Sequence, residues 1–287
     1  MATLHGQWTH LALAARLEKN LPMVSLPILG ALACGGRVKP IVCVVECFVL
    51  VIVLVYCTFL NTFTDRQLDS SSKPEQYEHL RRAGGGLVTA TLIAWVLVAV
   101  ALVWLITEAP LTVLILGGVA LFGGLYSFDA FRWRAATRWK AHWLTHAISF
   151  LACYVLMLEL GLVIASAHLA VSTLLFLGVS LSDYGVVIRE CAADGDAERR
   201  ANLRTLAALF TQAWNQRVAL AVALLGAACT IAASTFSVRL AVALIPPALV
   251  RLAVLRGGAG RWAIDGTFFL GRAFPILVLA VWPGGDA

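Results

Sequence analysis

The chain has 287 residues, of which 60% are hydrophobic and only 13% are charged, whereas about a quarter of the residues in an ordinary soluble domain are charged. This composition excludes a water-soluble globular enzyme and predicts a protein whose main solvent is lipid. The formal net charge of +6 does not indicate nucleic-acid binding, because the basic residues lie in short segments between apolar runs rather than in one patch. We therefore expect an integral membrane protein, surrounded by membrane lipids, that binds no nucleic acid.

Apolar runs bounded by Pro, Gly and charged residues predict about nine transmembrane helices. A bilayer core requires about 20 apolar residues per helix, so these spans leave no room for a separate soluble domain. The start has no cleavage-site pattern of a secretory signal, and we expect the first span to be retained. The expected fold is all-α, a single membrane domain over 1–287 whose helices surround a central cavity. The spans are predicted near 18–36, 40–63, 86–107, 110–128, 141–165, 168–188, 217–235, 238–255 and 265–283.

The Lys and Arg residues predict the orientation of these spans. Most of the 22 fall in the N-terminal segment and in every second connection, and such basic connections remain in the cytoplasm. We therefore expect a cytoplasmic N-terminus and a C-terminus on the opposite side. The two long loops, near 64–85 and 189–216, also lie on the cytoplasmic side, where we expect the active-site loops. Basic residues assigned to these connections include Arg66, Lys73, Arg81, Arg82, Arg132, Arg217 and Arg251.

A first group of oxygen-bearing side chains ends the second predicted span. Asn61, Asp65 and Asp69 are spaced four residues apart, and each step of four advances about 40° around a helix, so all three share one face. Carboxylate and amide oxygens suit Mg²⁺, which proteins commonly hold with one or two carboxylates plus substrate phosphates. The alternative is a solvated helix end with ordinary charges.

A second acidic group ends the sixth predicted span. Asp183, Glu190 and Asp194 fall within about 20° of one helical line, whereas Asp196 is assigned to the following loop. Asp183 lies about 10 Å inward from Glu190 by helix rise, and an ionisable residue at such a depth is by default a functional candidate. A metal-bound diphosphate between the two acidic helix ends, with its isoprenoid tail in an apolar cavity, accounts for both groups.

Other polar residues inside the predicted spans allow two interpretations each. His142 and His146 share one helix face and either ligate a metal ion or pack at the membrane interface, and no third ligand is evident nearby. Arg272 lies inside the last span and balances either Asp265 or Asp183.

Two motifs carry a resemblance to a known family. The first motif is Asn61-x3-Asp65-x3-Asp69 followed by Lys73-Pro74, and the second is Glu190-x3-Asp194. Together with the nine-helix plan, they resemble the UbiA-type intramembrane prenyltransferases, whose Asn/Asp-rich first motif and D-x3-D second motif bind Mg²⁺-diphosphate. The early segment from Arg16 to Gly35 and the pair Tyr126-Ser127 before a basic loop are similar to the family's layout. The resemblance covers essentially the whole chain.

The chain departs from the family pattern at several positions. Thr62 stands where many members have Asp, and Glu190 replaces the first Asp of the second motif. Gln76-Tyr77 stands where Arg-Pro often follows Lys-Pro. Glu still supplies oxygen ligands, so metal binding survives, but the diphosphate must be positioned from elsewhere, with Arg81 or Arg82 as candidates.

The resemblance implies a set of site residues. Asp183 is expected to orient a metal-bound water, position the acceptor or take its proton. Tyr126 or Tyr184 either stabilises an allylic cation through its ring face or packs as an interfacial aromatic. The basic residues contact phosphate or anchor the loops on the positive-inside pattern. Mg²⁺ is expected on Asn61, Asp65, Asp69, Glu190 and Asp194, the catalytic residues are Asp65, Asp69, Asp183, Glu190 and Asp194, and substrate contacts are assigned to Asn61, Lys73, Tyr126, Arg132, Arg138 and Lys140.

Three function classes are open at this stage. The preferred one is a Mg²⁺-dependent prenyltransferase that moves an isoprenyl group from a diphosphate to a lipophilic acceptor, aromatic acceptors included, because it needs only features already found. The second is a membrane terpene cyclase of the same fold, in which an internal double bond or water quenches the cation. The third is a non-catalytic lipid or ion transporter, for which the discontinuous helices of many transporters are not obvious.

Overall fold

The computed structural model describes residues 9–10, 13, 20–35, 39–64, 74–127, 142–164, 169–200, 204–235, 237–257 and 261–282. All regular elements named within these residues are helices. They are η1 (Leu21–Val24), α3 (Ser25–Ala33), α4 (Pro40–Thr64), α6 (Pro74–Glu108), α7 (Pro110–Ser127), α8 (Trp143–Ile164), α9 (Leu169–Cys191), η4 (Ala192–Asp194), α10 (Gly195–Arg200), α11 (Leu206–Leu209), α12 (Gln212–Ser234), α13 (Val238–Arg256) and α14 (Arg261–Val281).

The all-α prediction is confirmed, and a helix lies at each of the nine predicted spans. Among the described residues, four segments are long and apolar enough to cross a membrane, and four more helical segments are apolar but shorter. The count of nine spans therefore stays a prediction. The four long segments are Pro40–Asn61, Trp143–Val163, Gln212–Ser234 and Val238–Arg256.

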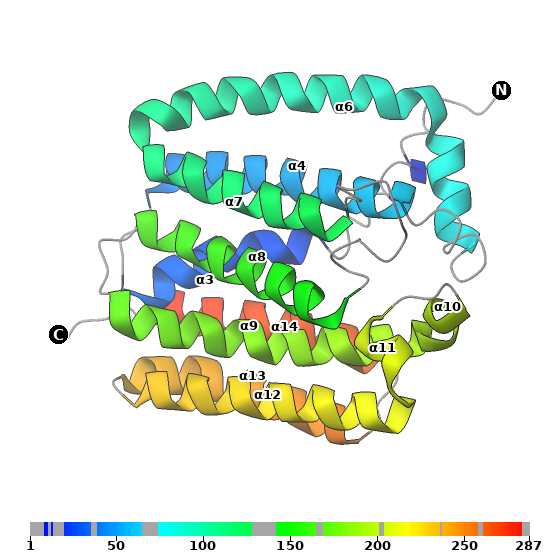
Figure 1. The fold of residues 1–287 in the computed structure, drawn as a ribbon. Helices are drawn as coiled ribbons and strands as arrows, with labels where there is room; N and C mark the ends of the chain where they lie inside the picture. The colour runs from blue at the N-terminus through cyan, green and yellow to red at the C-terminus, as the bar shows by residue number, and fades with distance from the viewer. Residues whose placement is uncertain are drawn as a thin grey trace.

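The helices lie side by side with their long axes roughly aligned (Figure 1). Helix α6 lies along one edge, and α12 and α13 lie along the opposite edge. Helix α8 packs on α3, α7 and α9, α9 packs on α12, and α13 packs on both α12 and α14. Because α14 also packs on α3, helices from the two ends of the described chain meet.

Glycines allow the closest helix crossings. A Cβ at Gly161 of α8 would lie 2.2 Å from the Pro27 carbonyl oxygen of α3, and a Cβ at Gly226 of α12 would lie 2.5 Å from the Ser182 backbone nitrogen of α9. Small residues at such contacts let two backbones approach, which is how membrane helices gain packing contacts where lipid supplies no hydrophobic driving force between them.

Apolar side chains cover much of the described outer surface. Ile41, Leu114 and Val281 are at least 70% exposed, while the buried core is also apolar. A helix that is apolar both inside and outside suits a lipid environment.

Several predicted boundaries differ from the observed ones. Helix α6 begins at Pro74, twelve residues before the predicted start near 86, because its amphipathic first turns are too polar to count as a span. The loop predicted near 189–216 contains α10 and α11. Arg217 and Arg251 were assigned to connections but lie inside α12 and α13, and Arg251 is buried.

Candidate active site

Helices α4 and α7 run in parallel and bring Asn61 and Tyr126 to the same end of the molecule. The Thr112 hydroxyl of α7 donates a 2.6 Å hydrogen bond to the Glu46 carboxylate of α4. Eleven residues further along each helix, a Cβ at Gly123 would lie 2.7 Å from the Cys57 sulfur. This equal spacing places Asn61, in the last turn of α4, level with the end of α7, where Tyr126 lies.

A second contact attaches the N-terminal segment to α4 near Asn61. The Asn20 side-chain amide donates a 2.9 Å hydrogen bond to the Thr58 hydroxyl, which itself donates to the Leu54 carbonyl at 3.0 Å. Thr58 is one helical turn before Asn61 and shares its face. Neither Asn20 nor Thr58 was predicted, although the i, i+3 spacing from Thr58 to Asn61 is visible in the sequence.

Three helices contribute a hydrogen-bonded chain of Tyr126, His146 and Tyr184. The Tyr126 hydroxyl lies 3.0 Å from His146 Nε2, and the Tyr184 hydroxyl lies 3.0 Å from His146 Nδ1. Tyr184 is buried, while Tyr126 and His146 are half-buried. Of the two interpretations for His146, the structure favours packing and hydrogen bonding over metal ligation. Within the described residues, no three His, Cys, Asp or Glu side chains gather closely enough to hold a metal ion.

The second acidic motif does not continue one α-helix. Helix α9 ends at Cys191, and Asp194 lies in the 3-10 helix η4, so the predicted helical line reaches Glu190 but does not extend to Asp194. A 3-10 turn advances about 120° per residue instead of about 100°, which changes the direction of every later side chain. Glu190 is half-buried, and the Asp194 side chain lies outside the described part of the structure.

The segment after this motif is held by its own contacts. A Cβ at Gly195 would lie 2.5 Å from the Ala207 carbonyl oxygen, and the Thr205 hydroxyl accepts a hydrogen bond from the Ala208 amide to cap α11. Asp196 lies in α10 instead of a loop, is exposed, and pairs with Arg199. This guanidinium holds the pKa of Asp196 below its ordinary value. Helices α10 and α11 thus lie beside the end of α9 as a structured connection (Figure 1).

Asp183 lies in a buried ion cluster. Its Oδ1 is 2.6 Å from an Arg251 nitrogen, and its Oδ2 is 3.2 Å from an Arg272 nitrogen. The Arg272 guanidinium is also 3.1 Å from the Tyr154 hydroxyl. All four side chains are less than 5% exposed. Of the two partners predicted for Arg272, the structure selects Asp183.

Gly271 gives Arg251 its place in this cluster. A Cβ at Gly271 of α14 would lie 1.9 Å from an Arg251 guanidinium nitrogen, so the guanidinium lies directly against the α14 backbone. Arg272, the next residue of α14, stacks over the Phe268 ring at 5.3 Å. Sequence reasoning missed Arg251 because its position near the end of a span is also typical of an interfacial anchor.

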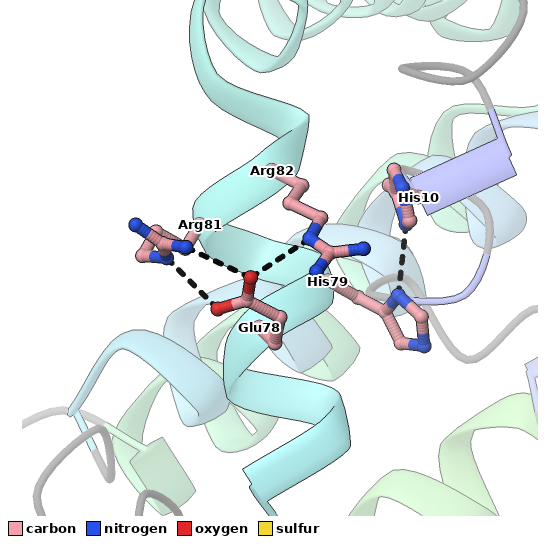
Figure 2. Close-up of polar contacts among 5 residues, drawn as sticks. All are labelled: His10, Glu78, His79, Arg81 and Arg82. Carbon is pink, nitrogen blue, oxygen red and sulfur yellow. Dashed lines mark hydrogen bonds and ion pairs between the residues drawn. The ribbon is translucent and has the colours of Figure 1, made fainter. Parts of the chain in front are cut away.

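The first turns of α6 carry the two arginines considered for diphosphate positioning. Arg81 donates two hydrogen bonds of 2.8 Å to Glu78, and Arg82 donates one of 2.7 Å (Figure 2). These contacts lower the pKa of Glu78 to about 2. Beside them, His79 Nδ1 lies 2.9 Å from His10 Nδ1, which connects the N-terminal segment to α6 (Figure 2). Both arginines are exposed, at a helix start that adjoins residues 65–73.

The remaining predicted site residues lie outside the described part of the chain. They are Asp65, Asp69, Lys73, Arg132, Arg138 and Lys140. Of the expected metal ligands, Asn61 and Glu190 have described side chains, and they belong to helices that end on the same side of the molecule (Figure 1). Their amide and carboxylate oxygens are of the kind that a hard cation like Mg²⁺ prefers.

Solved structures share this arrangement of helices. A UbiA homolog from Archaeoglobus fulgidus bound to GPP and Mg²⁺ matches with a TM-score of 0.69 and 16% sequence identity, covering 95% of this chain and 98% of that chain. The chain has the UbiA-type fold. An apo UbiA homolog from Aeropyrum pernix K1 matches with a TM-score of 0.65 and 21% identity, covering 92% of this chain and 97% of that chain. A digeranylgeranylglyceryl phosphate synthase matches with a TM-score of 0.63 and 14% identity, covering 96% and 98% of the two chains.

No family sequence model matches the chain, and no curated protein matches it. The UbiA-type fold is therefore recognised through structure, and it confirms the resemblance inferred from the motifs at the level of fold. Together with the apolar helices, this fold makes the chain an integral, multi-pass membrane protein.

Proposed function

We propose that this chain is a Mg²⁺-dependent intramembrane prenyltransferase, which moves an isoprenyl group from its diphosphate to a lipophilic acceptor. The observation that carries the proposal is the UbiA-type fold over 95% of the chain, with Asn61 and Glu190 on helices that end on the same side. Homologues with this fold have been solved with GPP and Mg²⁺ and with DMAPP and Mg²⁺.

The proposed site holds the diphosphate between the ends of α4 and α9. Asn61, Asp65 and Asp69 supply oxygens from one side, and Glu190 and Asp194 supply them from the other. When bound there, Mg²⁺ neutralises the negative charge that grows on the leaving diphosphate, a contribution worth several kcal/mol. Lys73, Arg132, Arg138 and Lys140 are proposed to donate to the phosphate oxygens, as cationic groups do in other phosphate sites.

The buried cluster of Asp183, Arg251 and Arg272 is proposed to orient α9. Asp183 is seven residues before Glu190 on this helix, so it lies about two turns deeper on nearly the same face. Ion pairs to α13 and α14 resist rotation of α9 about its axis, and Glu190 keeps its direction as a result.

The proposal is tested by incubating the purified protein with geranyl, farnesyl and geranylgeranyl diphosphate and a set of lipophilic acceptors. Turnover is expected with Mg²⁺ and none with a chelator. Asp65→Ala is expected to reduce turnover by about 100-fold or more, the usual effect of removing one group that stabilises developing charge. Asp196→Ala is the matched control, because Asp196 is exposed and pairs only locally with Arg199 in the described structure, and it is expected to remain within about twofold of the wild type.

Two results would overturn the proposal. Equal Mg²⁺-dependent turnover by Asp65→Ala and wild type would show that the first motif is not the metal site. Diphosphate release with a cyclic hydrocarbon as product, in the absence of any acceptor, would identify a terpene cyclase instead of a transferase.

A further inference from the structure

The buried cluster around Asp183 carries one more positive than negative charge in the part of the chain that the structure describes. The guanidiniums of Arg251 and Arg272 lie 2.6 and 3.2 Å from the one carboxylate of Asp183, and the nearby Tyr154 hydroxyl is neutral. All four side chains are less than 5% exposed. A buried charge without compensation is unfavourable, and an ionisable group inside a membrane bundle is by default a functional candidate. One further negative charge would balance the cluster.

Both guanidiniums also have N–H groups that no acceptor among the described residues uses. Arg251 Nε has no acceptor, and the Arg251 nitrogen nearest to Asp183 is not aligned with it as a hydrogen bond. Arg272 Nε likewise has no acceptor in this part of the chain. Buried donors without a partner are unfavourable, and the planar donor pattern of a guanidinium matches the oxygens of a carboxylate or a phosphate. The missing charge and the missing acceptors thus indicate the same kind of group, an oxyanion.

The contact of Arg272 with Met23 is the weakest in the cluster. An Arg272 nitrogen lies 3.2 Å from Met23 Sδ, and a thioether sulfur is only a weak acceptor. Met23 belongs to η1 and is half-buried, and its unbranched side chain adapts easily to a new neighbour. An anionic oxygen in place of this sulfur would give Arg272 a charged acceptor. The Tyr154 hydroxyl, which accepts from Arg272, can donate its own proton to the same oxygen.

The depth of the cluster suits the acceptor of a prenyl transfer better than the diphosphate. Asp183 is seven residues before Glu190 on α9, a separation of about 10 Å by helix rise. The proposed metal and diphosphate lie at the end of α9, so the cluster is about two turns deeper among the helices. A small aromatic molecule, or the polar end of a lipid, spans this distance with its charge in the cluster and its reacting atom beside the allylic carbon.

We infer that Arg251, Arg272 and Tyr154 bind the anionic group of the prenyl acceptor, a carboxylate or a phosphate, an inference that rests on the proposed prenyl transfer. The oxygens of this group accept from the unpaired N–H groups of both guanidiniums, while Asp183 holds the two guanidiniums in place. The acceptor is thus an amphiphile whose apolar part lies among the helices and whose charge is balanced inside the bundle.

Binding is tested by thermal unfolding of the purified protein in a neutral detergent, without isoprenyl diphosphate. Naphthoate and dodecyl phosphate are the anionic probes, and naphthamide and dodecanol are their neutral counterparts. A ligand that binds only the folded state raises the unfolding temperature, and a saturating anionic probe is expected to raise it by about 5 °C. The neutral counterparts should leave it unchanged. Stabilisation by naphthoate alone would identify an aromatic carboxylate as the ligand, and stabilisation by dodecyl phosphate alone would identify a lipid phosphate.

Three variants separate anion binding from a purely structural role. Arg251→Met leaves Arg272 paired with Asp183 and is expected to weaken binding of the anionic probe by about tenfold or more, the usual effect of losing a hydrogen bond to a charged group. Tyr154→Phe keeps the ring but loses the hydroxyl, and it should weaken binding in the same direction. Arg239→Met is the matched control on the same helix, because Arg239 is half-buried and donates to the Leu279 carbonyl oxygen, and it is expected to bind as wild type does.

The turnover assay shows which substrate the cluster serves. The anionic probes are expected to inhibit prenyl transfer in competition with the acceptor. Competition with the isoprenyl diphosphate instead would assign the cluster to the donor and overturn the inference.

The remaining failures are distinct. If no anionic probe stabilises wild type, or if Arg251→Met is stabilised as much as wild type, the cluster only holds the helices together, and the inference is wrong while prenyl transfer stands. If the anionic probes bind as expected but wild type turns over no isoprenyl diphosphate, the proposed function fails and the anion site stands.

Discussion

At the scale of single residues, the stability of this fold is most sensitive to its buried charged side chains. Asp183 pairs with two arginines while all three side chains are almost inaccessible to solvent. Removing one partner of such a pair leaves an uncompensated buried charge, which typically costs about 3–5 kcal/mol. The cluster thus depends on Asp183 more than on either arginine, because in the described part of the chain Asp183 is the carboxylate that pairs with both.

Asp183→Asn is therefore expected to lower the stability of the purified protein by about 3–5 kcal/mol. The measurement is thermal unfolding in detergent micelles, with Arg272→Met expected to cost less because Arg251 still balances Asp183. Glu78→Gln, at an exposed ion pair, is the control and should leave the unfolding temperature nearly unchanged, because exposed ion pairs contribute little to stability. Identical unfolding temperatures for Asp183→Asn and wild type would show that the cluster does not hold the helices together.

The exposed pairs at the start of α6 lead to a prediction about pH. Arg81 and Arg82 lower the pKa of Glu78 to about 2 from its model-compound value of 4.5, so the folded pKa lies below the unfolded one. The resulting stabilisation is present above the unfolded pKa and is lost as the pH falls through the folded pKa. Because both pKa values lie well below 6, we expect the contribution of Glu78 to stability to be constant above about pH 6.

A titration of the Glu78 carboxyl by NMR checks this expectation. Its midpoint should lie near 2 and move upward in Arg81→Met and Arg82→Met, each of which removes one guanidinium. High salt should also raise it, because the pair is exposed to screening. If neither substitution changed the midpoint, the hydrogen bonds drawn in Figure 2 would not form in solution.

At the scale of the elements, close helix crossings depend on glycine. Gly226 of α12 faces α9 so closely that a Cβ there would lie 2.5 Å from the Ser182 backbone nitrogen and 2.7 Å from the Gly178 carbonyl oxygen. Backbone atoms cannot move aside as a flexible side chain can, so added volume must separate the two helices. The packing of α9, which carries Asp183 and Glu190, is therefore sensitive to a glycine on α12 that contributes no side chain to the site.

Gly226→Ala is expected to destabilise the protein by about 1–3 kcal/mol, the typical effect of overpacking. Gly117→Ala on α7 provides the matched control, since nothing lies within 4 Å of the added Cβ. There the change should be neutral or stabilising, because Ala favours a helix over Gly by about 1 kcal/mol. Thermal unfolding compares the two, and a Gly226→Ala protein as stable as Gly117→Ala would contradict the observed crossing.

The helix boundaries also show which structural predictions can be made from local sequence pattern. Apolar runs located α4, α7, α8 and α13 within a few residues, because a membrane span is defined by continuous apolar length. The polar segment after α9 gave no such signal, so η4, α10 and α11 were missed. These short helices depend on contacts such as that of Gly195 with Ala207. The two residues are twelve positions apart, and no helical periodicity predicts that they meet.

At the scale of the whole molecule, the first and the last described segments lie at opposite ends of the helices. His10 contacts His79 at the start of α6, at the end where α10 and α11 lie, while α14 finishes at the other end (Figure 1). An odd number of spans accounts for this arrangement. The cytoplasmic placement of the N-terminus rests on the Lys and Arg pattern and stays a prediction.

Reporter fusions test that orientation. A reporter active only in the cytoplasm is expected to work at the N-terminus and fail at the C-terminus, and a reporter active only outside should give the opposite result. Activity of the same reporter at both termini would indicate an even number of spans. Such a result would favour the eight apolar helical segments that hydropathy recognises among the described residues over the nine predicted spans.

The sequence by itself determined that this protein is helical, lies in a membrane, and carries two oxygen-rich motifs at helix ends, because composition, apolar length and residue spacing are local properties. The depth of Asp183 followed from helix rise alone. Only the tertiary structure decided the partners: Arg251 and Arg272 for Asp183, and Tyr126 and Tyr184 for His146. Arg272 is 89 residues from Asp183, and residues so far apart meet only because several helices pack in one particular order, which no periodicity within a single helix specifies.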